Sequence, residues 1–462
     1  MRNAFLPVTL TAAILLTHMI SGAQGYQALH GSSFTGSTSV FNNPASIAHA
    51  VHRWELTLLS VQAKSSTNAS YLQNENGQRY LSMYDGYRSR FVHANMDASL
   101  LNFMYKIDEK QAVAVNFRIR NYVHSKTLPF NYVDSTVHSI NDFLIANRTT
   151  AFLEGFATTA GWVEADFSYA RVLSRTSRSQ LSGGITLQVM KNISGGFARL
   201  NKFSFLEQKS GSDTAYTFTN GSGSFAYSES LDAETPKEAW KQSPLSLGLS
   251  MGIEYLIYDD EDEKGPLNYS WKIGAGLMDL GSHSFTPSPN SRHFSDPKQS
   301  ITDADVDNKI SGAADAEGVA DSVATLFNNT SVITERFSIS QPTRLVLNID
   351  KRIAGNFYVN GDLSMNFYST SSYTKFRIRE LNMLTITPRW ETMVLGAYLP
   401  VQYNTQGQLW VGAALKLGPL TFGIHDLGLL LKKTPKPNGG GYLLLSIHPF
   451  SKAKEITRFD CR

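Results

Sequence analysis

Cysteine is almost absent from this chain, whose 462 residues include only Cys461. A single cysteine cannot form a disulfide within the chain, so packing and hydrogen bonding alone must hold the fold together. Neither sign of charge is in large excess, because 42 basic residues face 39 acidic ones and give a formal net charge of +3. These charges are scattered and form no basic patch or tail, so the sequence predicts no nucleic-acid partner.

Long apolar runs are also missing once the first residues are set aside. A membrane-spanning helix needs roughly 18 to 20 consecutive apolar residues, and no later segment approaches that length. At the N-terminus, Arg2 precedes an apolar stretch that ends at Ser21-Gly22-Ala23. This pattern predicts a secretory signal peptide over residues 1–23, with a membrane-anchor helix as the alternative. The mature chain would begin at Gln24 and be exported.

The sequence is rich instead in strict alternation of apolar and polar residues. From Leu245 to Ile257 every odd-numbered residue is apolar, and the even-numbered ones up to Glu254 are small or charged. A period of two places each class on one face of a β-strand, whereas a helix would scatter both. The apolar face is long enough for a tilted membrane crossing of about 9 to 11 residues.

About fourteen such segments follow one another along the chain, an even number as bacterial single-chain barrels require. Short and long connections alternate between them, which is typical of barrels with tight turns at the periplasmic end and long loops outside. The expected fold is therefore all-β: a transmembrane antiparallel β-barrel of about 14 strands, with an N-terminal plug-like segment and long outer loops. A soluble periplasmic β-protein is the structural alternative. By residue, the expected parts are a signal peptide at 1–23, a plug or hatch segment at 24–53, the barrel at 54–450 with an outer insertion at 282–342, and a periplasmic tail at 451–462.

Two segments outside the strands have a character of their own. Residues 24–53 are rich in glycine, serine and asparagine and precede the first convincing strand, so we expect them to occupy the lumen. Within the outer insertion, the alanine-rich stretch at 301–328 predicts a helical segment. The insertion either folds over the barrel mouth or contacts a ligand or partner.

Charged side chains on the predicted strands fall on the polar face. An arginine or lysine facing lipid would cost roughly 2 to 4 kcal/mol near the midplane, so we expect these side chains inside the barrel. There they either select a passing solute or pair with one another across a filled lumen. The lumen and ligand candidates are Asn116, Arg118, Arg120, Glu164, Asp166, Lys272, Arg344 and Asp362.

Several short motifs resemble those of known outer-membrane barrels. Asn42-Asn43-Pro44-Ala45-Ser46 resembles the N-terminal Asn-Pro-Ala element of FadL-type long-chain fatty-acid transporters and of PorV-type proteins of the type IX secretion system. This resemblance implies that Asn43, Pro44 and Ala45 form a plug or hatch in the lumen. A closer resemblance is to an uncharacterised family of Bacteroidota outer-membrane barrels. Its motifs here are Asp279-Leu280-Gly281, Pro388-Arg389-Trp390-Glu391, Gly396-Ala397-Tyr398-Leu399-Pro400, Leu417-Gly418-Pro419-Leu420 with Gly423, and the late cysteine Cys461.

Catalytic and metal-binding patterns do not stand out. No serine or cysteine is placed beside a base in a way that would activate it, so we expect no enzyme. The 11 histidines lack metal-ligand spacing, so we expect no metal and no cofactor. His425 and Asp426 are neighbours at a predicted strand end and point to opposite faces, so they cannot serve one site together. We expect His425 to be a surface histidine. The acidic run that begins at Asp259 is expected to be a solvated turn.

Two functions stay open. The first is a FadL-like channel or transporter that admits a small or amphipathic solute past the plug. The second is a non-conducting barrel that acts as an adaptor or surface-binding platform in a cell-envelope or secretion complex. The expected location is the outer membrane of a Gram-negative cell, surrounded by lipid and lipopolysaccharide, with a small amphipathic solute or an envelope protein as partner.

Overall fold

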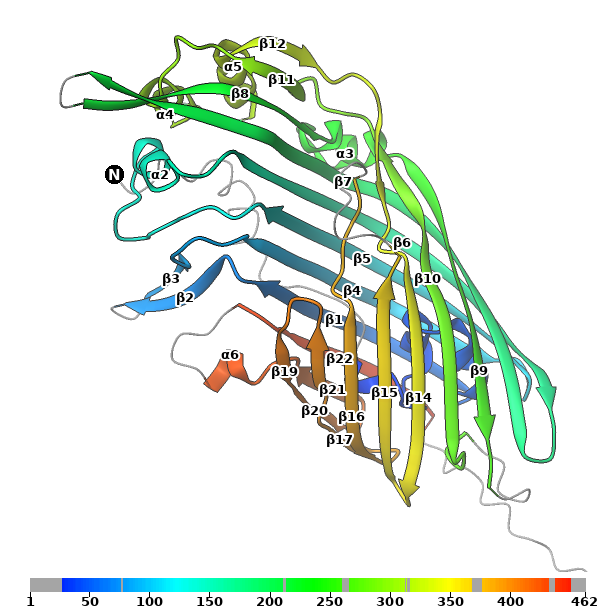
Figure 1. Cartoon of the computed structure of the whole chain (residues 1–462). Helices are drawn as coiled ribbons and strands as arrows, with labels where there is room; N and C mark the ends of the chain where they lie inside the picture. The colour runs from blue at the N-terminus through cyan, green and yellow to red at the C-terminus, as the bar shows by residue number, and fades with distance from the viewer. Residues whose placement is uncertain are drawn as a thin grey trace, which may run out of the picture.

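The computed structural model describes residues 27–75, 78–210, 213–259, 266–311, 313, 316–367, 376–431 and 437–449. The expected signal peptide, the tail at 451–462 with Cys461, and most of the acidic run after Asp259 lie outside these residues. The strands form one closed antiparallel barrel of fourteen staves, which confirms the predicted fold (Figure 1). No helix among the described residues is long and apolar enough to cross a membrane.

Each stave pairs with the next along the chain, and β22 returns to pair with β1, so the barrel has no free edge. Two staves are interrupted, one between β17 and β18 and one between β19 and β20. The staves are β1 (Trp54–Thr67), β4 (Phe91–Lys106), β5 (Gln111–Thr127), β6 (Leu153–Arg175), β7 (Ser179–Ser210), β9 (Leu245–Ile257), β10 (Trp271–Phe285), β14 (Arg344–Ala354), β15 (Phe357–Asn366), β16 (Met383–Glu391), β17 (Leu395–Tyr398) with β18 (Val401–Asn404), β19 (Leu409–Val411) with β20 (Ala413–Leu417), β21 (Leu420–Ile424) and β22 (Gly441–Ile447).

Apolar side chains cover the outside of the barrel. Along β9, the exposed residues are the odd-numbered ones that the alternation assigned to one face, and Leu245 is 70% exposed. The same outward face on β5 exposes Phe117 and Ile119. Such a continuous belt is far larger than the few hundred Å² of apolar patch that soluble monomers usually expose.

Aromatic side chains lie at the end of the barrel where the turns are short. Trp54 of β1 is the register partner of Tyr105 on β4, and Tyr105 and Tyr169 are both partners of Val113 on β5. Rows of aromatic residues at this level are typical of the membrane–water interface of barrels. The turn 107–110 between β4 and β5 and the turn 176–178 between β6 and β7 both lie at this end.

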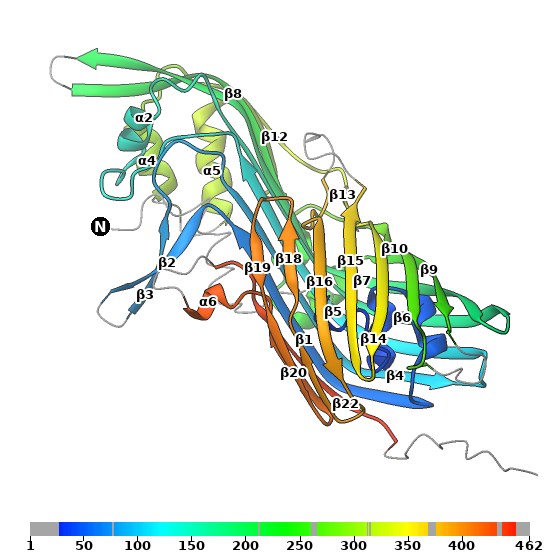
Figure 2. The same cartoon turned by 60° about the horizontal axis from the view of Figure 1, so that its bottom comes forward.

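At the other end, one wall rises well beyond the rest (Figures 1 and 2). The expected loop after Asn192 is largely strand, since β7 runs on to Ser210 and turns back as β8 (Asp213–Tyr227). β8 pairs with β11 (Arg292–Pro297), and β11 pairs with β12 (Phe327–Val332). Together with the helices that follow, they form what we call the outer extension. Its helices are α2 (Ile140–Ala146), α4 (Asp303–Ser311) and α5 (Ala316–Leu326).

The outer extension has a small apolar core of its own. Phe203, Phe294 and Val323 are buried against one another, with partly buried residues such as Phe327 around them. Helices α4 and α5 occupy the alanine-rich stretch and confirm the helical segment predicted there. The remaining elements at this end are a hairpin of β2 (Ser70–Glu75) and β3 (Gln78–Met83), η4 (Glu229–Leu231), α3 (Pro236–Gln242), β13 (Phe337–Ser340) and α6 (Gly428–Leu431).

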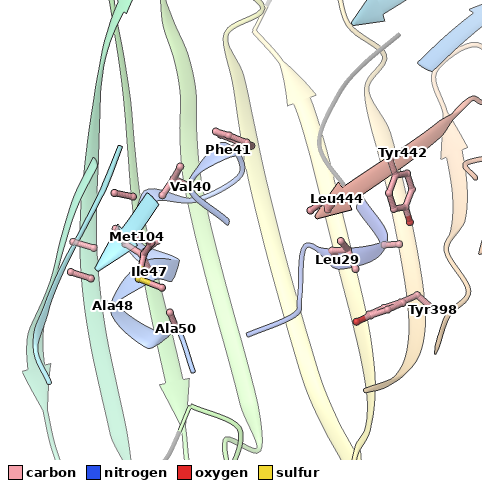
Figure 3. Packing of buried hydrophobic residues seen from close by; sticks show 14 of the residues in the cluster. Leu29, Val40, Phe41, Ile47, Ala48, Ala50, Met104, Tyr398, Tyr442 and Leu444 are labelled. Carbon is pink, nitrogen blue, oxygen red and sulfur yellow. The ribbon is translucent and has the colours of Figure 1, made fainter. Parts of the chain in front are cut away.

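Residues 27–53 lie inside the barrel as three short 3-10 helices, η1 (Gln27–Leu29), η2 (Gly36–Phe41) and η3 (Pro44–His49). We call this segment the plug. Figure 3 shows Leu29 beside Tyr398, Tyr442 and Leu444 of β17 and β22, while Ile47 lies toward Met104 of β4. The plug therefore packs against several strands of the wall through one apolar cluster.

Candidate functional site

The plug motif lies in a space left by glycines on the inner faces of β7, β9 and β10. A Cβ atom added at Gly184 would lie 2.5 Å from the amide nitrogen of Ala45 and 2.6 Å from the carbonyl oxygen of Pro44. A Cβ at Gly252 would lie 2.9 Å from Cγ of Asn43. Any larger residue would collide with the plug, so these glycines form the surface that receives it. Two more, Gly274 and Gly276, approach Asn43 and Asn42.

Asn43 fixes the motif in this space. Its side-chain oxygen accepts a hydrogen bond from Ala45 N at 3.0 Å and caps η3, where Pro44 occupies the first position. Its Nδ2 donates to the carbonyl oxygen of Ile253 on β9 at 2.9 Å. One asparagine thus starts the helix and also binds it to the wall. The Asn-Pro-Ala order is explained by local backbone chemistry in addition to docking.

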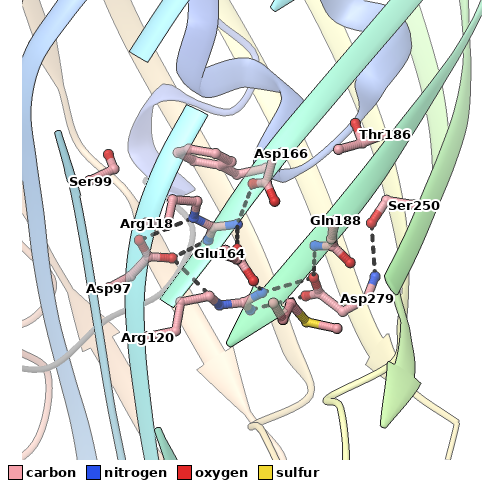
Figure 4. Close-up of polar contacts among 12 residues, drawn as sticks. Asp97, Ser99, Arg118, Arg120, Glu164, Asp166, Thr186, Gln188, Ser250 and Asp279 are labelled. Carbon is pink, nitrogen blue, oxygen red and sulfur yellow. Dashed lines mark hydrogen bonds and ion pairs between the residues drawn. The ribbon is translucent and has the colours of Figure 1, made fainter. Parts of the chain in front are cut away.

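Buried charges form a network on the lumen side of the wall (Figure 4). Arg118 of β5 donates to Glu164 of β6 at 2.8 Å and forms an ion pair with Asp97 of β4. Arg120, two residues further along the same face, donates to Asp279 of β10 at 2.9 Å. Since β10 is several staves away from β5, this second arginine connects distant parts of the wall.

Asp279 is the centre of the network. It accepts hydrogen bonds from Arg120, from Arg344 at 3.0 Å and from Gln188 at 3.0 Å. The register of β10 against β9 shifts between Leu277 and Leu280, and Asp279 has a positive φ of 56°. A bulge of this kind places two consecutive residues on one face, so Met278 and Asp279 are both buried.

A second charged group lies on β14 and β16. Arg389 pairs with Asp350 and donates to Glu391 Oε1 at 2.9 Å, and its Nη2 lies 3.2 Å from Tyr269 Oη. The same Nη2 donates to the backbone oxygen of Gly31 in the plug at 3.0 Å. Both Arg389 and Glu391 belong to the Pro388-Arg389-Trp390-Glu391 motif, so that motif supplies lumen charges.

The lumen candidates from the sequence are all buried on the inner face. Arg118, Arg120, Glu164, Asp166 and Arg344 belong to the network around Asp279. The others are spread along the lumen. Asn116 is the register partner of Asp166, Lys272 Nζ donates to the backbone oxygen of Gly31 at 2.6 Å, and Asp362 pairs with His30 of the plug.

Sequence reasoning missed several inward-facing groups. Asp97 and Asp350 lie on strands whose alternation would have placed them inside, but neither was singled out. Asp279 was invisible as a lumen residue because the bulge changes the face on which it lies. His425 was expected at the surface and this was wrong: it is 1% exposed and its Nε2 lies 2.7 Å from Gln62 Nε2. His425 directly follows β21 and keeps the inward orientation that Thr421 has on that strand.

Above the network, at the long-loop end, apolar side chains fill the lumen. Tyr122 and Trp162 stack with ring centroids 5.2 Å apart, and Phe285 stacks on Phe337 at 5.4 Å. Ile378 joins this cluster from the segment 376–382, which lies inside the barrel mouth. The lumen therefore has a charged level and an apolar level. Among the described residues no three histidine, cysteine, aspartate or glutamate side chains converge as metal ligands.

Some solved structures resemble this one distantly. They include a Pseudomonas aeruginosa FadL homologue with 11% identity and a TM-score of 0.42. The match covers 91% of this chain and 95% of the homologue. A deletion mutant of the monoaromatic hydrocarbon channel TodX has 10% identity, a TM-score of 0.43 and coverages of 92% and 97%. The P. putida toluene transporter TodX has 10% identity and a TM-score of 0.40, and the match covers 90% of this chain and 95% of TodX. At this level the likenesses carry no argument about this chain.

Sequence comparison gives a clearer result. No curated protein matches the chain. A protein-family model matches residues 44–425, which begin at Pro44 of the plug motif and include nearly all of the barrel. That range also contains both charged groups of the lumen, so their residues lie within the family's common domain. The chain belongs to the family of unknown function DUF5723.

Proposed function

We propose that this protein is an outer-membrane channel seen in its closed state, in which the plug must move to admit a small or amphipathic solute. The apolar belt and the aromatic residues at the short-turn end support the membrane location, since both match the surface that a bilayer requires. The closed lumen supports a gate, because the plug and the segment 376–382 fill it from the two ends.

The observation that best supports a movable plug is which residues the buried ion pairs join. Among the arginines of the two charged groups, each described ion pair joins two wall residues, or joins the wall to Glu380 of the segment 376–382. The plug is held by hydrogen bonds, by two histidine contacts and by packing. Leaving a buried charge without its partner is strongly unfavourable. When the plug withdraws, the wall arginines therefore keep their carboxylates, whereas Lys272, Glu254 and Asp362 exchange their plug partners for water or solute.

The two levels of the lumen suggest which solutes would pass. Charged side chains surround the plug, whereas aromatic and aliphatic ones fill the space above it. A solute with both a polar and an apolar part would find partners at each level. We therefore favour an amphipathic solute over a purely ionic one.

Proteoliposomes provide the test. The intact chain should admit solutes slowly, and a chain without residues 24–53 should admit them much faster. The barrel of the truncated chain is checked by heat-dependent gel mobility, so that misfolding is recognised. If the truncated barrel is folded and still excludes small sugars and amphiphiles, the channel proposal is wrong.

The outer extension supports a second candidate, an adaptor or surface-binding platform. It has its own core and rises beyond the barrel wall at the long-loop end (Figure 2). Leu206 on the projecting part of β7 is 62% exposed. Photo-crosslinkers placed at such positions should recover one envelope partner in cells. Recovery of no partner, together with solute flux through the truncated barrel, would reject this candidate.

A further inference from the structure

A small cavity in the lumen is lined by the cations Lys64 and Arg379, by the carboxylate of Glu380 and by neutral side chains. It is bounded by β1, by β4 and by Arg379, Glu380 and Leu381 of the segment inside the mouth. His93 Nδ1 lies 3.3 Å from the backbone oxygen of Arg379, which fixes this segment against β4. The cavity therefore has a rigid wall on one side and the mouth segment on the other.

Lys64 sets this cavity apart from the rest of the lumen. It faces inward from β1 and is only 5% exposed. Its Nζ makes no hydrogen bond and no ion pair with any residue in the described parts of the chain. Every buried arginine of the two charged groups described above has a carboxylate partner. Glu380 and Asp362 are the acidic residues that act on this ammonium through space, but neither forms an ion pair with it, so the position leaves room for a further anion at contact distance.

The carboxylate that lines the cavity is already engaged by other groups. Glu380 accepts a hydrogen bond from Asn95 at 3.2 Å and lies 3.7 Å from Arg344. Arg379, the neighbouring residue, brings a second cation to the cavity and lies with its guanidinium 5.3 Å from the ring centroid of Phe156. Two cations thus share one cavity, and the one carboxylate that lines it is bound by other groups.

We propose that this cavity binds the carboxylate or phosphate group of a solute, with Lys64 as the residue that holds the charge and Arg379 as the second cation. An ammonium beside a guanidinium is a donor set that suits such oxyanions. The cavity is small, so the group it accepts must be compact. A second cavity that Arg379 also lines is bounded by the rings of Phe156 and Phe376 and by two further cations, Arg199 and Arg377. The inference rests on the proposed function, because a solute reaches this site only by entering the lumen.

Thermal unfolding in detergent tests the site without any flux. The full chain is heated in chloride, in acetate and in inorganic phosphate at equal ionic strength, and unfolding is followed by gel mobility. Both oxyanions should raise the unfolding temperature of the wild type and of Lys351→Gln, a control on β14 whose lysine lies over Trp271, 4.4 Å from the ring centroid. Lys64→Gln should show no such rise. In chloride it should already unfold at a higher temperature than the wild type, because it lacks the unpaired ammonium.

Two results would overturn the proposal: no oxyanion effect on the wild type, or an equal effect on Lys64→Gln. Hexyl phosphate separates the sources of the anion, since tighter binding than inorganic phosphate indicates the head group of an amphiphile and equal binding indicates a free anion. The two proposals fail in different experiments. If the channel proposal is wrong, the truncated barrel shows no flux, while the oxyanion effect in detergent is still observed.

Discussion

Replacing Gly184 by alanine should open the channel without damaging the barrel. The new Cβ would lie 2.5 Å from Ala45 N and 2.6 Å from Pro44 O, whereas non-bonded heavy atoms prefer about 3.5 to 4.0 Å. The wall cannot yield, because β7 is paired with β6 on one side and with β9 on the other. The plug must therefore move by on the order of 1 Å, which is the gap between these distances.

The size of the effect follows from the cost of such a collision. Overpacking by a single methyl group typically costs about 1 to 3 kcal/mol. If that cost falls on the docked plug alone, the ratio of undocked to docked plug rises roughly 5- to 150-fold. Conductance in planar bilayers should rise by up to a comparable factor, because undocking removes one of the two segments that fill the lumen.

The adjacent residue provides a matched control. Gly183 belongs to the same strand but faces outward, where a Cβ would meet the flexible end of Leu173 at 3.0 Å. A second readout is the labelling rate of Ser39→Cys in the plug, measured in a Cys461→Ser background. Gly184→Ala should increase both conductance and labelling, and Gly183→Ala should change neither. Equal behaviour of the two variants would refute the reasoning, since the same methyl group would then act without touching the plug.

Three further predictions concern the wall, the buried charges and the outer extension. Phe117→Arg puts a cation on the lipid-facing belt and should lower the stability of the folded barrel in liposomes by roughly 2 to 4 kcal/mol, measured by urea titration; an unchanged midpoint would mean that this face does not touch lipid. Arg389→Met leaves two carboxylates buried without their cation and should cost about 3 to 5 kcal/mol in the same titration, with part regained when Asp350→Leu is added. Asp303→Ala removes the acceptor for Tyr216 N and for the Asn141 side chain, both at 2.7 Å, and should speed protease cleavage of the outer extension. The control Asp321→Ala, at an exposed position, should leave the cleavage rate unchanged. Neither variant should change the unfolding temperature of the barrel.

The sequence was sufficient for the barrel because each strand has the same two environments along its length. Alternation in 245–257 predicts which side chains face outward, and the structure exposes those residues. The fourteen staves and the order of short and long connections follow from the same pattern. A local rule repeated many times is what a single sequence displays best.

The lumen contacts were harder to foresee, because they depend on register between distant strands. His93 and His124 are direct cross-strand partners with ring centroids 4.2 Å apart, although 31 positions separate them in the sequence. Asp279 faces inward only because of the bulge that precedes it, and a bulge leaves no distinct mark in a pattern of apolar and polar residues. Lys64 could not be singled out from the sequence, because only the positions of the surrounding side chains show that no carboxylate among the described residues forms an ion pair with it.

The plug precedes β1 directly in the chain, yet its neighbours come from strands as far along as β16 and β22. An open sheet could not surround it. The surface that holds the plug is therefore complete only when β22 meets β1 and the curled sheet becomes a cylinder. We expect enclosure of this segment and sealing of the β1–β22 seam to occur as one cooperative event, so that a weakened seam delays burial of the N-terminal segment as well.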